Sequence, residues 1–205
     1  MKSDLRVVRT KQNIKKAFID LLEEKGFDAI SIKDITERGM MNRGTFYAHY
    51  LDKYDLLDQL KQSLIDKMTE IIDQHIDTVI EALDINTIQQ SPQNVSVKMI
   101  EFINQEHRLF HILLVKQGDY AFQMDMKQII QRVIESNFEV GKRNTNFDYI
   151  SAYITSANIG ILQQWLHKGR QESPEIIAQM IATITLNGPM KAMQIMKGSA
   201  SDNDV

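Results

Sequence analysis

The chain has 205 residues, of which 43% are hydrophobic and 25% charged, with nine glycines and three prolines. This length suffices for one large domain or two smaller ones that bury a core without a disulfide or a metal, and the scarcity of helix breakers favours an all-α protein. The absence of cysteine excludes a disulfide framework and a Cys-ligated zinc site, and it fits a reducing compartment such as the cytoplasm.

Charge is divided unevenly along the chain. Residues 1–55 carry 11 Lys and Arg against nine Asp and Glu, whereas residues 56–205 carry 13 against 18. The basic excess is greatest before Phe18, where one acidic residue, Asp4, accompanies six basic ones: Lys2, Arg6, Arg9, Lys11, Lys15 and Lys16. Such a patch suits nucleic-acid phosphates, although charge alone favours an ordinary solvated helix end.

The same charges interrupt the apolar stretch that a secretory signal requires, so no export is expected. The longest uncharged run, residues 149–167, contains serine, threonine, asparagine and glutamine side chains that hydrocarbon would not solvate. We therefore expect a buried protein helix there, no membrane contact, and a cytoplasmic protein.

Local residue patterns near the N-terminus predict the first two helices. Between residues 10 and 24, five apolar positions follow the spacing of one helical face: Ile14, Ala17, Phe18, Leu21 and Leu22. Gly26 ends this helix. Ser31 followed by Asp34 is typical of a capping box that opens a second helix, which Gly39 ends.

A third helix is predicted over residues 43–50, with Asn42 as its N-cap. Phe46 and Tyr50 form its inner side, and the outer side carries five residues: Arg43, Gly44, Thr45, Tyr47 and Ala48. A guanidinium, hydroxyls, a methyl group and a glycine are chemistries that suit a DNA groove. The three helices predict a helix-turn-helix whose last helix would enter the major groove, although other small three-helix bundles have the same spacing.

These residues carry a resemblance to a known family. The stretch from Ile14 to Leu57 looks like the DNA-binding domain of TetR-family transcriptional regulators. The most diagnostic part is the run Gly44-Thr45-Phe46-Tyr47-Ala48-His49-Tyr50, followed by Asp52-Lys53.

The resemblance implies two roles for side chains of this domain. By this resemblance, Arg43 and Thr45 would read bases. Phosphates are held by Tyr47, His49 and Lys53, and the DNA-binding set also includes Asn42 and Gly44. For Lys53 the local sequence also favours a phosphate contact. Asp52 is predicted to cap a fourth helix, and the Lys53 ammonium would lie in its first turn, where backbone N–H groups can also bind phosphate. His49 also lies beside the core on a helical wheel, where it would simply pack.

The turn between the second and third helices departs from the family pattern. Where relatives usually have Ala-Gly-Val, this chain has Gly39, Met40 and Met41. The glycine that usually takes a positive φ is displaced by one residue, and a methionine in the left-handed region costs about 1 kcal/mol. We expect either that Met40 accepts this strain or that the turn is shifted.

The rest of the sequence predicts a larger helical domain. We expect residues 1–52 to form the helix-turn-helix domain and residues 53–205 to form an effector-binding and dimerisation domain, with about nine helices in all. The predicted helices of the second domain cover residues 53–84, 95–117, 120–141, 147–168 and 174–196. They are separated by a loop at residues 86–94, a break at Gly118-Asp119, a turn at residues 144–146, and the N-cap pair Ser173-Pro174.

The helices predicted at residues 147–168 and 174–196 are the least charged segments of the chain. Two stripes of small residues run along them: Ala152, Ser156 and Gly160 in the first, and Ala178, Ala182 and Thr185 in the second. Such stripes allow close approach of another helix, so we expect either internal core helices or a four-helix homodimer interface. The TetR resemblance implies the homodimer.

The C-terminal half resembles, more weakly, the domain of Firmicutes-type members of this family. The residues that carry this resemblance are Leu109-Phe110, Leu113-Leu114, the stretch from Tyr153 to Trp165, and Ser173-Pro174-Glu175. It implies either a ligand-responsive repressor or an adaptor-like regulator, of the kind that controls dihydroxyacetone kinase operons with a partner protein. The sequence leaves both open.

Effector and metal candidates in this half rest on residue type alone. Candidate effector-binding residues are Met99, Phe110, Met124, Tyr153 and Trp165, all of which also suit a core. His107 and His111 have the i, i+4 spacing of a metal pair, but two ligands are too few to identify a site, so no metal and no cofactor is expected. No nucleophile, phosphate-loop or dinucleotide motif is present, and an enzyme is not expected.

The function expected is therefore that of a TetR-type repressor. A homodimer would bind a palindromic double-stranded operator, and a small-molecule ligand of unknown identity would release it. The alternative is a regulator whose C-terminal domain docks a protein co-activator.

Overall fold

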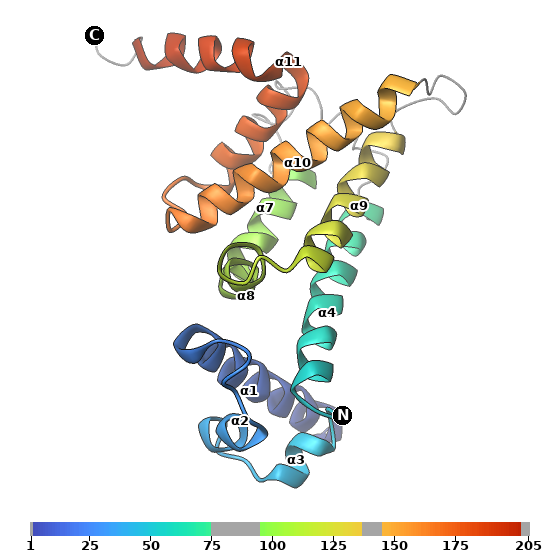
Figure 1. Cartoon of the computed structure of the whole chain (residues 1–205), viewed down its shortest axis with the longest axis vertical. Helices are drawn as coiled ribbons and strands as arrows, with labels where there is room; N and C mark the ends of the chain where they lie inside the picture. Colours follow the sequence, from blue (N-terminus) through green and yellow to red (C-terminus); the bar gives the residue numbers. More distant parts are fainter. Residues whose placement is uncertain (1, 75–94, 137–144, 202–205) are drawn as a thin grey trace. The chain divides into compact units, whose positions relative to one another are not determined.

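The computed structural model describes residues 2–74, 95–136 and 145–201, and these ranges contain helices and no strand (Figure 1). The elements are α1 (Lys2–Lys25), α2 (Ile32–Arg38), α3 (Arg43–Tyr47), α4 (Lys53–Asp73), α7 (Val95–Gln105), α8 (His107–His111), the π-helix η2 (Ile112–Lys116), α9 (Tyr120–Ser136), α10 (Thr145–His167) and α11 (Pro174–Ser201). The all-α prediction is confirmed. The predicted loop at residues 86–94, and the ends of the predicted helices 53–84 and 120–141, lie outside the described residues.

The chain divides into two compact units, Met1–Asp66 and Lys67–Val205, so that the division falls inside α4. The predicted boundary between residues 52 and 53 would instead have assigned the whole of α4 to the second unit. Each unit has its own core of buried apolar side chains.

The first unit packs α1, α2, α3 and the start of α4 around five side chains with no exposed surface: Ile14, Phe18, Ile35, Phe46 and Leu56. Ile14, Phe18 and Phe46 are apolar positions that the helical spacing predicted on the inner faces. α1 begins at Lys2, well before the predicted residue 10, and its residues Leu5 to Arg9 are all exposed.

Local hydrogen bonds and two ion pairs hold α2 in place. Ser31 and Asp34 form the predicted capping box, and Asp34 also pairs with Lys25 of α1 at 2.9 Å. The Ser31 hydroxyl and the Lys25 ammonium hold the pKa of Asp34 well below its usual value. Arg38 binds both carboxylate oxygens of Glu24 at 2.6 and 2.7 Å, so both ends of α2 are tied to α1.

In the second unit, the predicted helix 95–117 is wrong, because α7 ends at Gln105 and Glu106 has non-helical φ and ψ of −96° and 18°. α8 follows, and the chain then widens into the π-helix η2. Its residues Ile112, Leu113 and Leu114 are buried, and the Gln163 side chain donates to the Leu114 carbonyl at 3.0 Å. The π-helix is accompanied by core packing and by this hydrogen bond from α10. The spacing of apolar residues along the sequence indicates neither of them.

The last two helices also depart from prediction. α10 begins at Thr145, inside the predicted turn at residues 144–146. α11 is bent, because Gly188 has φ 74° and ψ 160° and Pro189 follows it (Figure 1). Proline excludes the helical region for the residue before it, and glycine is the residue that tolerates a positive φ there. The continuous helix predicted over residues 174–196 is therefore wrong at this Gly-Pro pair.

Candidate nucleic-acid interface

The candidate recognition helix, α3, is built from a local cap. The Asn42 side-chain oxygen accepts hydrogen bonds from the Thr45 backbone N–H at 2.8 Å and from the Thr45 hydroxyl at 3.0 Å. The helix ends at Tyr47, three residues before the predicted end, but Tyr50 still packs against Phe46 with ring centroids 5.7 Å apart. The predicted inner side is thus present although the helix is shorter.

The outer side of α3 faces away from the core. Arg43, Gly44, Tyr47 and Ala48 are exposed, and Thr45 is half-buried. Arg43 makes no ion pair or side-chain hydrogen bond within the described part of the chain. A guanidinium without an internal partner, next to an exposed phenol, is available to another molecule.

Gly44 has no packing reason to be glycine. A Cβ added there would meet only the Asn42 side-chain oxygen, at 3.4 Å, and the residue is helical. A larger residue is therefore compatible with the unit's own structure. The absence of a side chain leaves the backbone open to close approach from outside.

His49 lies between the core and the surface. It is half-buried, and its ring contacts Tyr50 edge-on with centroids 6.4 Å apart. Both expectations for this residue, a phosphate contact and a packed ring, are compatible with that position.

Lys53 is held inside the first unit. Its ammonium donates to the backbone carbonyls of Phe27, Asp28 and Ile30 at 3.0, 3.1 and 2.9 Å. It also lies 4.7 Å from the centre of the Phe27 ring and 5.6 Å from that of Tyr54. No sequence signal indicated these contacts, because the carbonyls belong to a segment more than twenty positions earlier in the chain.

The turn before α3 contains the expected strain. Met40 has φ 49° and is 94% exposed, whereas Gly39 has φ −81°. A Cβ at Gly39 would collide with the Met41 side chain and lie 3.1 Å from the Ile35 carbonyl oxygen. A side chain at Gly39 would therefore require the end of Met41 to move and would lie tightly against the Ile35 carbonyl, while Met40 takes the left-handed conformation.

Replacing Met40 with glycine is expected to stabilise the first unit by about 0.5–1 kcal/mol, because the relief of left-handed strain exceeds the entropy that glycine adds to the unfolded chain. Urea unfolding measures this gain. Glu37→Gly, at an exposed position inside α2, is the matched control and is expected to lose about 1 kcal/mol. A loss of stability in both variants would contradict the account of the turn.

The second unit contains a cavity of about 160 Å³. Helices α4, α7, α9, α10 and α11 contribute its walls, through residues that include Met68, Met99, Ile129, Asn158 and Ala178. Among the described residues that line it, none is ionisable, and the polar ones are Ser96, Asn158 and Thr185.

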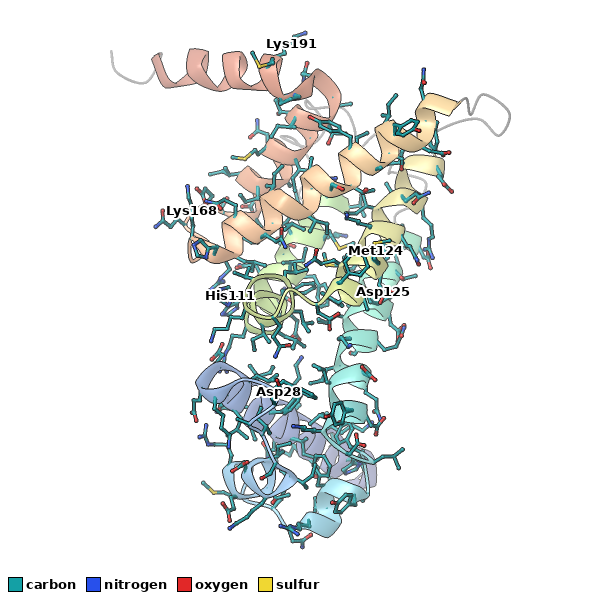
Figure 2. The ribbon with its side chains drawn as sticks, in the orientation of Figure 1. Asp28, His111, Met124, Asp125, Lys168 and Lys191 are labelled. Atoms are coloured by element: carbon teal, nitrogen blue, oxygen red, sulfur yellow. The ribbon has the colours of Figure 1, made fainter. Side chains whose placement is uncertain are left out.

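Of the predicted effector residues, Met99 lines this cavity. Phe110 is fully buried against Phe122, and Trp165 is buried with its indole N–H donating to the Glu172 carbonyl. Met124 on α9, labelled in Figure 2, and the half-exposed Tyr153 are not among the lining residues. The sequence did not indicate the other lining residues, because their residue types and spacing are those of ordinary core positions.

The two histidines of the predicted metal pair lie at the ends of α8. His107 Nδ1 is 3.0 Å from the Asn104 carbonyl oxygen. Within residues 2–74, 95–136 and 145–201, no group of three or more His, Cys, Asp or Glu side chains is arranged to hold a metal ion.

The small-residue stripes of α10 and α11 differ in exposure. Ala152, Ser156 and Gly160 of α10 are exposed, and three large side chains on the same helix are more than half exposed: Tyr149, Ile150 and Tyr153. By contrast, Ala178 and Ala182 of α11 are buried and line the cavity. Only the α10 stripe is therefore available to a second molecule. No described helix is long and apolar enough to cross a membrane.

In a comparison with known proteins, two family models match different parts of this chain. Residues 14–60 match the model described as "Bacterial regulatory proteins, tetR family", and residues 90–187 match the one described as "Transcriptional regulator C-terminal region". The chain is 30% identical over 196 residues to the HTH-type transcriptional regulator YxbF of Bacillus subtilis (strain 168), and 22% identical over 124 residues to YuxN of the same organism. These alignments cover 86% and 59% of this chain but only 44% and 39% of the relatives, so the chain spans less than half of their length.

Two solved structures share the fold. The dihydroxyacetone kinase operon activator DhaS has a TM-score of 0.58 at 20% identity, with 88% of this chain and 96% of that chain covered. A TetR transcriptional regulator from Streptococcus agalactiae 2603V has a TM-score of 0.59 at 24% identity, with 90% and 98% covered.

Proposed function

We propose that this chain is a TetR-type transcriptional regulator, because residues 14–60 match the TetR-family model and residues 90–187 match a transcriptional-regulator C-terminal model. In this proposal it acts as a repressor that binds a palindromic operator as a homodimer and is released by a small-molecule ligand. The observation that carries this proposal is the outer side of α3. It presents Arg43 and Tyr47 to solvent. Arg43 has no ion pair or side-chain hydrogen bond among the described residues, and the Tyr47 ring contacts Phe46 edge-on.

Each exposed group on α3 suits a different part of DNA. The Arg43 guanidinium matches guanine O6 and N7 in the major groove. The Thr45 hydroxyl donates to Asn42, so it would accept a hydrogen bond from a base and offer its methyl group to thymine. Tyr47 and His49 lie farther along and would meet phosphates, with Asn42 and the open backbone of Gly44 close to the groove.

A second copy of the chain is the partner proposed for α10 and α11. The exposed side of α10 combines small residues with Tyr149 and Ile150, and α11 adds Ile176 and Leu186, each about half exposed. The two recognition helices of such a two-fold dimer would have to meet half-sites about 34–36 Å apart, one turn of DNA.

The cavity favours a small-molecule effector over a protein co-activator. Its volume of about 160 Å³ and its apolar walls suit an uncharged ligand about as large as one ring or a short acyl chain. Asn158 offers a polar group to such a ligand. Release of DNA requires only that the ligand binds the released state more tightly than the DNA-bound state.

The test of DNA binding is a selection from random duplexes followed by DNase footprinting with the unaltered protein. We expect a protected palindrome whose half-site centres lie about one helical turn apart. Uniform, sequence-independent protection, or a single unpaired half-site, would contradict the proposed operator recognition.

Ala178→Met is expected to abolish ligand binding in the cavity, because Ala178 is fully buried in its wall and the longer side chain occupies the space. The probes are 1-octanol and octanoate, and the measurement is the thermal midpoint. A neutral ligand at 100 times its Kd stabilises by about 2.7 kcal/mol, so the unaltered protein should respond to the alcohol. Ala121→Met, at an exposed position of α9, should respond equally well.

Two results would contradict this account of the effector site. Persistent stabilisation of Ala178→Met by 1-octanol would place the ligand elsewhere. Stronger stabilisation by octanoate would show that a charged group is preferred.

A further inference from the structure

The contacts of Lys53 use every donor that it has. A lysine ammonium carries three N–H groups, and Lys53 directs them to three carbonyl oxygens at 2.9–3.1 Å. The aromatic faces of Phe27 and Tyr54 lie on the same cation. A DNA phosphate would therefore have to displace at least one of these bonds.

These bonds join two parts of the first unit. The three carbonyls belong to residues 27–30, in the segment that connects α1 to α2, and Lys53 is the first residue of α4. Asp52 fixes the same end of α4, because its carboxylate accepts from the backbone N–H groups of Tyr54 and Asp55 at 2.8 Å. α4 continues without a break to Asp73, and its later residues Met68 and Ile72 line the cavity.

We propose that Lys53 is a positioning residue that fastens the start of α4 to the α1–α2 segment and thereby fixes the half-site spacing that the dimer accepts. This inference rests on the proposed function. It replaces the phosphate contact that the family resemblance implied for this side chain. The physical reason is that bonds at the base of a helix fix the direction of that helix relative to the α1–α2 segment. A phosphate contact would instead hold the protein on the duplex and make its affinity more dependent on salt.

Lys53→Met is the variant that separates the two roles. Methionine keeps an aliphatic stem between Phe27 and Tyr54 but removes all three donors and the charge. Lys168→Met is the matched control, because Lys168 is an exposed lysine at the end of α10 and loses the same charge (Figure 2). Affinity is measured on the selected operator and on versions with one base pair inserted or deleted between the half-sites.

The unaltered protein and Lys168→Met are expected to lose about tenfold or more in affinity for each altered spacing, since one base pair shifts a half-site by about 3.4 Å and rotates it. Lys53→Met is expected to bind the unaltered operator about tenfold more weakly and to lose less than about threefold on altered spacing. The slope of log affinity against log salt concentration should stay unchanged.

A fall of about 0.9 in that slope for Lys53→Met, with spacing preference retained, would show a phosphate contact and overturn the proposal. Phe27→Leu is the second variant, since it weakens the same contact without removing charge and should relax spacing preference in the same direction. If Phe27→Leu, which keeps the three carbonyl bonds, relaxed spacing preference more than Lys53→Met, these bonds would not be the fastening contact and the proposal would also fail. Absence of operator binding by the unaltered protein would instead refute the proposed function itself.

Discussion

Replacing Gly160 with leucine is expected to convert the dimer into a monomer and to lower operator affinity by about 100-fold or more, because the two half-sites would no longer be bound by one linked pair. Gly160 is exposed on α10, and beyond the nearby backbone of α10 itself a Cβ added there meets no atom of the described residues within 4 Å. Leucine also has the higher helix propensity, so the subunit should not lose stability. Only a helix of a second copy, packed closely over Ala152, Ser156 and Gly160, would be displaced.

Sedimentation equilibrium provides the measurement, since the mass should fall from twice 23.7 kDa to 23.7 kDa. Ala121→Leu, at an exposed position of α9, controls for added apolar surface and should remain dimeric with full affinity. A Gly160→Leu protein that stays dimeric and binds the operator normally would exclude this side of α10 as the interface.

Arg43→Ala is expected to lower affinity for the selected operator by about 10- to 100-fold and to leave binding to random DNA nearly unchanged, because a bidentate contact to guanine is worth about 1–3 kcal/mol. The fold should be unaffected, since Arg43 is exposed and has no internal partner among the described residues. The variant should also relax base preference at one position in each half-site.

Tyr47→Ala is the matched comparison on the same helix. Tyr47 is 54% exposed and is expected to contact phosphate, so its loss should weaken binding to all sequences alike. Fluorescence anisotropy with the operator, single-base variants and random duplexes at one salt concentration measures both effects. Equal losses on specific and random DNA for both variants would contradict the roles assigned to Arg43 and Tyr47.

One helix, α4, carries both Lys53 and two residues of the cavity wall. α4 begins at Lys53, which is fastened to the α1–α2 segment, and contributes Met68 and Ile72 to the cavity wall. Under the proposed function, a ligand that moved Met68 and Ile72 would act on the helix whose first turn Lys53 holds. Lys53→Met therefore tests the start of α4, and Ala178→Met, on α11, tests the cavity that the later part of α4 lines.

Several features of this protein were determined by sequence alone. The caps at Ser31, Asn42 and Asp52 each form hydrogen bonds within three positions of the chain, so the residues that make them are readable side by side. The inner positions of α1 and α3 follow helical spacing and are buried as predicted. Gly188 and Pro189 are also neighbours in the sequence, so the bend at this pair is predictable from residue type.

Other features were decided only by the tertiary structure. Lys53 finds its carbonyl partners 23 to 26 positions away, the π-helix η2 receives a hydrogen bond from Gln163 on α10, and the cavity is bounded by five helices. The physical reason is reach: capping and periodicity act within one or two helical turns, whereas the partner of a long flexible side chain and the space left between helices depend on how distant segments pack.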